Sequence, residues 1–293
     1  MAGKSKLERS GKRIERWFDN ENQRIFRFTE LRSAFALNKK NTWRLAEKDA
    51  FEDFTDYLVR YSKLRRHQFN FPNQEFVIYS WGDDVSIFEI VLALGSGAYL
   101  SHFSAAYIHE LTEQVPKTIY VTVPQPRKRS EVVILTQDQI DSAFTKPDRV
   151  TNAVATFQKY RVARLTGMDS YGLGVVEAQE SGGGAVLVTN LERTLIDMVV
   201  RPLYSGGISQ VLEAFRIARG KISANKLVSI LRQMDFIYPY HQAIGFYMQR
   251  AGYPQSSLRL MRRIELKNNF YLAHGMQDMD FDAEWRLFFP KGF

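Results

Sequence analysis

The sequence predicts a mixed α+β fold with two domains, and three observations lead to it. The segment from Thr29 to Trp81 is typical of two short helices followed by two extended runs around a Pro72-Asn73 turn. After it, helical and extended segments alternate with Gly and Ser, and towards the C-terminus helical patterns dominate. We therefore predict a winged helix-turn-helix at residues 1–82 and a larger mixed α/β domain at residues 83–293, ending in a bundle-like helical region.

The helices of the first domain are predicted from apolar spacing. Phe51, Phe54, Leu58 and Tyr61 recur at intervals of three and four, which places them on one helical face. Thr29 is the expected N-cap of the preceding helix, which should run through Phe35. The loop between these two helices, from Asn38 to Lys48, is longer than a minimal turn.

The second domain begins where the composition changes, at Trp81–Asp84. Strands are predicted at Thr118–Val123, Val132–Leu135, Tyr171–Ala178 and Ala185–Val188, with a short extended segment at Glu265–Ala273. Helices are predicted at Ser86–Leu94, Ser101–Leu111, Ser209–Arg219, Ser223–Met234 and Pro239–Ala251. Thr189 and Glu192 form a capping-box pattern that predicts a further helix, ending at Arg201.

Composition excludes several classes of protein. The chain has 293 residues, 45% of them hydrophobic and 25% charged, as in an ordinary globular protein. It has no cysteine, so disulfides and Cys-ligated metal sites are excluded. No stretch approaches the ~18 apolar residues of a transmembrane helix, and the basic start lacks the apolar core of a secretory signal. We expect a cytoplasmic protein without a membrane partner.

The positive charge is concentrated near the N-terminus. The formal net charge is +8, and residues 1–80 hold 17 Lys and Arg against 11 Asp and Glu. The remaining residues hold 23 against 21. Because nucleic-acid binding requires a concentrated positive surface that releases counterions from phosphate, the first domain is predicted to bind double-stranded DNA.

Two kinds of DNA contact are expected from this domain. Thr55 and Arg60 on the second helix are predicted to read bases, and the loop and wing cations to hold phosphate. Asp53 and Asp56 on the same helix would repel phosphate, which moves the expected interface towards the loop and the wing. The predicted DNA-binding residues are Lys39, Lys40, Arg44, Thr55, Arg60, Lys63, Arg65, Arg66 and His67.

Catalytic and cofactor signatures are weak. His102 and His109 lie two helical turns apart, too far to share one zinc ion, and are interpreted as packing residues. Arg193, Asp197 and Arg201 are spaced by four, so each could pair with the next along one helix face. We predict no catalytic residue, no metal and no cofactor.

Four segments resemble the AbiEi-type antitoxins of bacterial type IV toxin–antitoxin systems. They are Ala98–Ala106 with Leu111-Thr112, Pro116–Val121, Thr189–Asp197, and Arg201-Pro202 with Tyr204–Gly207. The resemblance covers most of the chain from about Phe26 onward. It implies an N-terminal winged helix that binds inverted repeats in the protein's own promoter and represses the operon. It also implies a C-terminal domain that counteracts a cognate nucleotidyltransferase-like toxin.

Two other classes of function are weighed against this one. The Glu265-Leu266-Lys267 run, on a predicted strand, matches one element of the sites of metal-dependent nucleases. Such a site would also need a second acid on an adjacent strand to hold the metal ion. An enzyme of this kind, or a toxin-modifying transferase, is the alternative hypothesis. A purely protein-binding module is the third, and it predicts a partner but no affinity for DNA.

Overall fold

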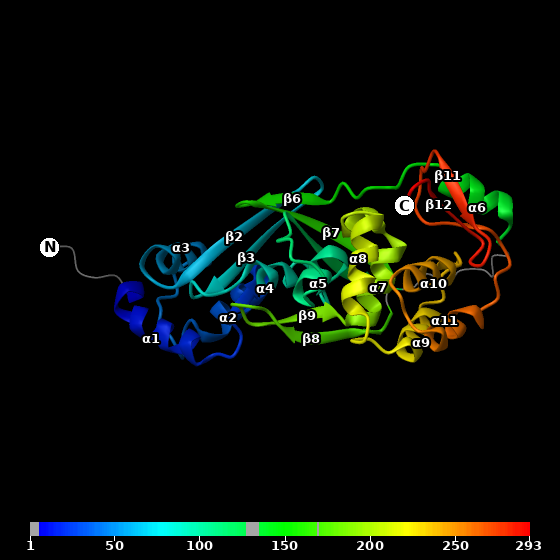
Figure 1. Cartoon of the computed structure of the whole chain (residues 1–293). Helices are drawn as coiled ribbons and strands as arrows, with labels where there is room; N and C mark the ends of the chain where they lie inside the picture. Colours follow the sequence, from blue (N-terminus) through cyan, green and yellow to red (C-terminus); the bar gives the residue numbers. More distant parts are fainter. Residues whose placement is uncertain (1–5, 127–134, 169) are drawn as a thin grey trace.

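The computed structural model describes residues 6–126, 135–168 and 170–293, and its fold is a mixed α+β one. Within these ranges the chain forms three sheets, and Figure 1 shows the elements following one another from the N-terminal helices to a C-terminal group of helices. No helix in the described part of the chain is long and apolar enough to cross a bilayer. The predicted strand Val132–Leu135 falls almost entirely outside the described residues.

The N-terminal part combines three helices with a small antiparallel sheet. Its elements are α1 (Lys6–Asn20), β1 (Ile25–Arg27), α2 (Phe28–Asn38), α3 (Phe51–Tyr61), β2 (Leu64–Phe71) and β3 (Gln74–Trp81). The strand order is β1-β3-β2, so β3 lies in the middle and pairs with both neighbours. Trp43, in the loop between α2 and α3, is fully buried and stacks on Phe54 at 4.9 Å between ring centroids. This loop is therefore anchored in the core.

Two sequence expectations here need correction. Tyr61 was placed on the buried face of α3, but its side chain is 64% exposed because it is the last residue of the helix. The helix α2 begins at Phe28, before Thr29, and the Glu30 carboxylate accepts a hydrogen bond from the Arg27 backbone N–H at 2.8 Å. Phe51, Phe54 and Leu58 are buried as predicted.

The β2–β3 hairpin belongs to two hydrophobic cores. Near α1 and α3, Leu64, Tyr79 and Trp81 pack in the N-terminal core. Towards the tip, Phe69 and Phe71 pack with the strands of the central sheet. The hairpin is therefore packed along its length. Burying these aromatic side chains is more favourable than leaving the hairpin as a free, extended wing.

The central part is built around a six-stranded mixed sheet, counted over the described residues, with the order β6-β7-β5-β4-β9-β8. Its elements are α4 (Ile87–Leu92), β4 (Tyr99–Leu100), α5 (His102–Ile108), β5 (Thr118–Gln125), β6 (Val154–Phe157), β7 (Tyr160–Met168), β8 (Val175–Gln179) and β9 (Ala185–Thr189). The helix α6 (Gln137–Phe144) lies between β5 and β6 in the sequence but packs beside β11 (Met279–Asp282) and β12 (Leu287–Pro290) of the C-terminal part (Figure 1). The predicted strand Thr118–Val123 is confirmed as part of β5, which pairs in parallel with β7. The strand β7 was not predicted, because Arg161 and Arg164 interrupt its apolar pattern.

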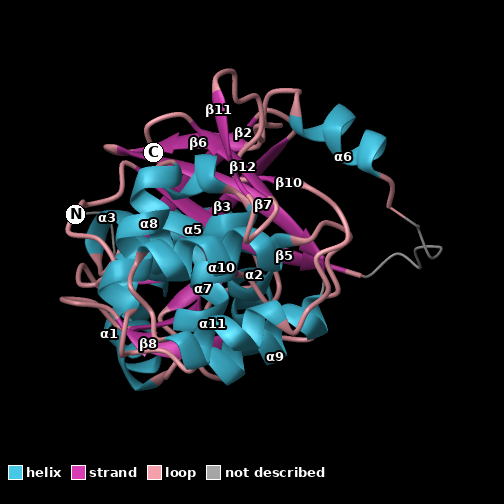
Figure 2. Cartoon of the chain, turned by 45° about the vertical axis from the view of Figure 1, so that its right-hand side comes forward, coloured by secondary structure: helices cyan, strands magenta, loops and turns pink. Residues whose placement is uncertain are grey.

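The C-terminal part is mainly helical. Its elements are α7 (Leu191–Val200), a 3-10 turn η1 (Pro202–Ser205), α8 (Ile208–Ala218), α9 (Ala224–Met234), α10 (Tyr240–Arg250), α11 (Gln255–Arg262), β10 (Phe270–Tyr271), β11 (Met279–Asp282) and β12 (Leu287–Pro290). Figure 2 shows α5, α7, α8 and α10 as one group of neighbouring helices, and side chains from these helices share the largest core. The predicted helices at Ser209–Arg219, Ser223–Met234 and Pro239–Ala251 are confirmed within a residue or two.

The start of α7 differs from the predicted capping box. Asn190, and not Thr189, is the N-cap, and its side-chain oxygen accepts from the Arg193 backbone N–H at 2.9 Å. Glu192 instead reaches α9, where it accepts from the Ser223 N–H at 3.0 Å and pairs with Lys226 at 2.9 Å. Glu192, which the capping-box pattern predicts to cap its own helix, therefore links α7 to α9.

Candidate functional site

The predicted DNA-binding residues divide into two groups according to their partners. On β2 and beside it, the cations are paired with acids of the same N-terminal part. Lys63 pairs with Asp19 at 2.9 Å, and Arg66 pairs with Asp56 at 2.8 Å. Because the neighbouring acid offsets the charge of each cation, these side chains present less positive charge to phosphate than an unpaired cation does.

Arg65 and His67 are also held in place. The Arg65 guanidinium donates to both carboxylate oxygens of Asp83, at 2.7 and 3.2 Å. The Nε2 atom of His67 lies 2.8 Å from the Ser80 hydroxyl, and burial lowers the pKa of His67, so this residue is a weak source of positive charge at neutral pH. Figure 1 shows this strand running from α3 towards β6, and the Phe69 ring of β2 stacks on Phe157 of β6.

Thr55 requires a correction. Its side chain is 1% exposed, and its hydroxyl donates to the Glu52 carbonyl oxygen at 3.0 Å. A buried hydroxyl that is already bonded does not reach a base edge, so Thr55 does not read a base as predicted. Arg60 stays exposed at the end of α3, with its guanidinium over the Tyr61 ring.

The cations of the α2–α3 loop are open. Among the described residues, no acid lies within ion-pair distance of Lys40, Arg44 or Lys48, and all three are exposed. Lys39 is different, since its ammonium group donates to the Glu47 carbonyl oxygen at 2.6 Å. The loop therefore presents three cations on a backbone that buried Trp43 holds in place.

Helix α1 adds cations beside this loop, which sequence reasoning did not select. The Arg13 guanidinium donates to the Trp43 carbonyl oxygen at 3.3 Å, and the Trp17 ring lies edge-on to the Trp43 ring at 5.2 Å. Lys12 and Arg16 on α1 are exposed and have no ion-pair partner within the described ranges. The sequence Leu7–Phe18 is rich in Lys and Arg, but only the fold brings α1 next to the loop.

The nuclease fragment does not form a site. Glu265 and Lys267 lie outside any strand and pair with each other at 3.2 Å, with side chains 73% and 70% exposed. In the part of the chain that the structure describes, no group of three or more His, Asp or Glu side chains is placed to hold a metal ion. Ser104 and His109, a potential nucleophile and base on neighbouring turns, bond elsewhere: Ser104 accepts from the Tyr120 N–H, and the imidazole of His109 donates to the Thr189 carbonyl oxygen.

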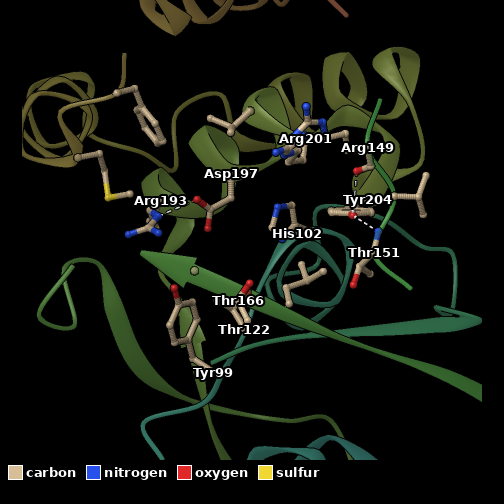
Figure 3. A pocket seen from close by; sticks show the side chains of 16 residues that line it. Tyr99, His102, Thr122, Arg149, Thr151, Thr166, Arg193, Asp197, Arg201 and Tyr204 are labelled. Carbon is tan, nitrogen blue, oxygen red and sulfur yellow. Dashed lines mark hydrogen bonds and ion pairs between the residues drawn. The ribbon is translucent and has the colours of Figure 1, made fainter. Parts of the chain in front are cut away.

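A cavity of about 360 Å³ with both polar and apolar walls lies between the central sheet and α7. It is lined by Tyr99, His102, Thr122, Arg149, Val150, Thr151, Leu165, Thr166, Gly167, Arg193, Asp197, Val200, Arg201, Tyr204, Met234 and Phe236. Figure 3 shows that its charged side chains come from α7 and from the segment before β6, with His102 rising from α5. We call it the α7 cavity.

The ion pair inside the α7 cavity is buried. Arg193 Nε lies 2.7 Å from Asp197 Oδ1, and the two side chains are only 5% and 10% exposed. Arg193 also donates to the Leu173 carbonyl oxygen at 3.0 Å, so it ties α7 to the segment before β8. The predicted pairing of Arg193 with Asp197 is confirmed. Arg201 instead approaches Asp148, at 3.7 Å.

His102 is the most perturbed group of this cavity. Burial lowers its pKa to about 4; the Asp197 carboxylate opposes this shift, while Arg193 and Arg201 add to it. Its Nδ1 atom lies 2.9 Å from the Ser101 hydroxyl, which in turn lies 2.7 Å from the Thr122 hydroxyl. Its φ angle is 52°, in the left-handed region that side chains seldom adopt. The imidazole is therefore neutral at physiological pH.

Comparisons with known proteins give information on the fold alone. No protein-family model matches the chain, and no curated protein matches it by sequence. Among solved structures, the chain is similar to the crystal structure of the RV2827C protein from Mycobacterium tuberculosis, with a TM-score of 0.56 and 15% sequence identity. The match covers 96% of this chain and 91% of the other, so the two proteins share a fold over nearly their whole lengths.

Proposed function

We propose that this protein is a DNA-binding antitoxin that represses its own promoter. The observation that carries the DNA-binding part is the element order α-β-α-α-β-β of residues 6–81, with a sheet of order β1-β3-β2. This is the order of a winged helix, a fold that places a helix in the major groove of DNA. The antitoxin part rests on the sequence resemblance to AbiEi-type proteins.

The charge distribution assigns the DNA-facing side in this proposal. The exposed side of α3 carries Glu52, Asp53 and Asp56, and the hairpin tip packs in the central core, so neither is the main phosphate contact. Lys40 and Arg44 in the α2–α3 loop, with Lys12 and Arg16 of α1 nearby, are the open cations. Phosphate contacts from these residues would position the protein on the duplex, and Arg60 remains available for a base edge.

The test uses the full chain and a DNA fragment from upstream of its own gene. Binding is measured by fluorescence anisotropy against a scrambled fragment of equal length. We expect at least ~10³-fold preference for the promoter fragment, as for specific DNA-binding proteins. The double substitution Lys40→Glu with Arg44→Glu should weaken binding at least ~100-fold, and lower the slope of log K against log salt by about two.

The matched control is Arg216→Glu with Lys221→Glu, which changes the net charge equally, in the last turn of α8 and in the α8–α9 connection. It should alter affinity less than ~3-fold. If the control weakens binding as much as the loop variant, the effect is one of net charge and the proposed interface is wrong. If the promoter fragment is bound no better than the scrambled one, the repressor function itself is overturned.

The antitoxin part is tested in cells. If the reading frame next to this gene encodes a nucleotidyltransferase-like protein, co-expression of the full chain should restore growth to cells that this protein poisons. The loop variant Lys40→Glu with Arg44→Glu should still restore growth when both genes are driven by foreign promoters. Failure of the wild-type chain to rescue would remove the antitoxin role and leave a DNA-binding protein.

A further inference from the structure

The α7 cavity has an excess of positive charge that its own acid does not balance. Arg193 bonds to one carboxylate oxygen of Asp197, and Arg149 and Arg201 are, in the described part of the chain, the cations of the lining without a hydrogen-bonded acid. The Arg201 side chain is 41% exposed, and its nearest acid, Asp148, is at 3.7 Å, beyond hydrogen-bond distance. Arg149 is exposed and has no ion-pair partner among the described residues. Two guanidinium groups at the rim of a cavity are typical of a site for an anion.

His102 supplies an independent observation inside the same cavity. Its side chain is buried, and Figure 3 shows the imidazole pointing from α5 towards the side where Asp197 and Arg201 lie. With Nδ1 bonded to Ser101, Nε2 has no hydrogen-bond partner within the described ranges. This nitrogen is not among the buried, unsatisfied atoms of the described residues, so it is accessible from the cavity and can bond a ligand atom. The left-handed backbone at His102 holds the ring in this position at a cost in strain.

The walls of the cavity indicate that the anion carries an organic body. Tyr204 and Phe236 present aromatic rings, and Val200 and Met234 add apolar surface. The Tyr204 hydroxyl accepts from the Thr151 N–H at 2.8 Å, which fixes the rim segment against the cavity. A volume of about 360 Å³ is within the range of small-molecule sites, and far larger than a free phosphate ion requires.

We propose that the α7 cavity binds a small organic phosphate. Arg201 and Arg149 hold the phosphate, the Nε2–H of neutral His102 donates to one of its oxygens, and Tyr204 and Phe236 cover the body of the ligand. Donors that arrive from separate elements suit a tetrahedral group, whereas one guanidinium fork satisfies a planar carboxylate. The pairing of Asp197 with Arg193 offsets the negative charge that this carboxylate presents to the ligand.

The experiment is isothermal titration calorimetry on the full chain with matched probes. The phosphates are ribose 5-phosphate and adenosine 5′-monophosphate, and the controls are ribose, adenosine, inorganic phosphate and citrate. At least one organic phosphate should bind with a Kd below 1 mM, and at least tenfold tighter than its dephosphorylated partner and than inorganic phosphate. Absence of such binding, or equal binding of citrate, would overturn the proposal.

Three variants locate the binding. Arg201→Gln should weaken the affinity at least tenfold, and Arg149→Gln, at an exposed position that tolerates substitution, should weaken it about fivefold. His102→Asn removes the donor while keeping a residue that accepts a left-handed backbone, and it should also weaken binding. The control Lys40→Glu with Arg44→Glu, on the DNA-facing side, should leave the affinity unchanged. If the control loses binding and the cavity variants keep it, the phosphate binds at the N-terminal surface and the cavity assignment is wrong.

Discussion

The N-terminal surface and the α7 cavity use the same charged residue types in opposite ways. On the surface, Arg66 and Asp56 are 40% and 68% exposed, and water screens their attraction. In the cavity, Arg193 and Asp197 are 5% and 10% exposed, and each would be costly to bury without the other. An exposed pair therefore contributes little to stability, whereas the Arg193–Asp197 pair is a structural element of the cavity.

The largest difference should appear when one partner of each pair is removed. Arg193→Met leaves the Asp197 carboxylate buried without its cation, and should lower the free energy of unfolding by about 3–5 kcal/mol. Arg216→Met, which breaks an exposed pair with Glu213 on α8, should lower it by at most about 1 kcal/mol. Urea unfolding of both variants measures this contrast. Equal losses in the free energy of unfolding would mean that the buried pair stabilises the protein no more than the exposed pair does.

Acid should act on the cavity region more than on the surface. The unfolded chain protonates His102 at its ordinary pKa of 6.5, but the folded chain protonates it only near a pKa of about 4. Between these values the unfolded state binds more protons, so stability falls as the pH drops from about 6.5 to about 4, by up to about 1.4 kcal/mol per pH unit.

The variant that checks this is His102→Asn, which should flatten part of the pH dependence of urea unfolding. Burial also lowers the pKa of His241 to about 4, so the His102→Asn protein should keep the pH dependence of stability that His241 causes. The substitution His241→Asn should remove this second contribution. A profile identical to that of the wild type in the His102→Asn protein would show that His102 is protonated in the folded state at its ordinary pKa.

The smallest effect is expected from the paired cations of β2. Arg66→Gln should change the free energy of unfolding by about 1 kcal/mol or less, because its pair with Asp56 is exposed. It should also change promoter affinity less than ~3-fold, far below the loss from Lys40→Glu with Arg44→Glu. A loss of affinity as large as that of the loop variant would show that the hairpin binds DNA together with the loop, as the sequence predicts.

Several elements could be predicted because local chemistry determines them. The apolar spacing of α3, the β-branched run of β5 and the cap at Ser223 each act within a few residues. The confirmed helices of the C-terminal part could be predicted for the same reason. The strand β7 escaped prediction because its arginines are stabilised by neighbours far along the chain, as when Arg164 donates to the Leu94 carbonyl oxygen at 3.1 Å.

What the sequence by itself determined was the position of the charge and the types of the elements, since both are local properties of the chain. Only the tertiary structure decided which charges are available. Asp83 and Asp56 engage Arg65 and Arg66, whereas Lys40 and Arg44 stay open. The same holds for the α7 cavity, where His102 and Arg193 are 91 positions apart in sequence but meet because α5 packs on α7. Burial and ion pairing depend on neighbours in space, and spacing along the chain does not encode them.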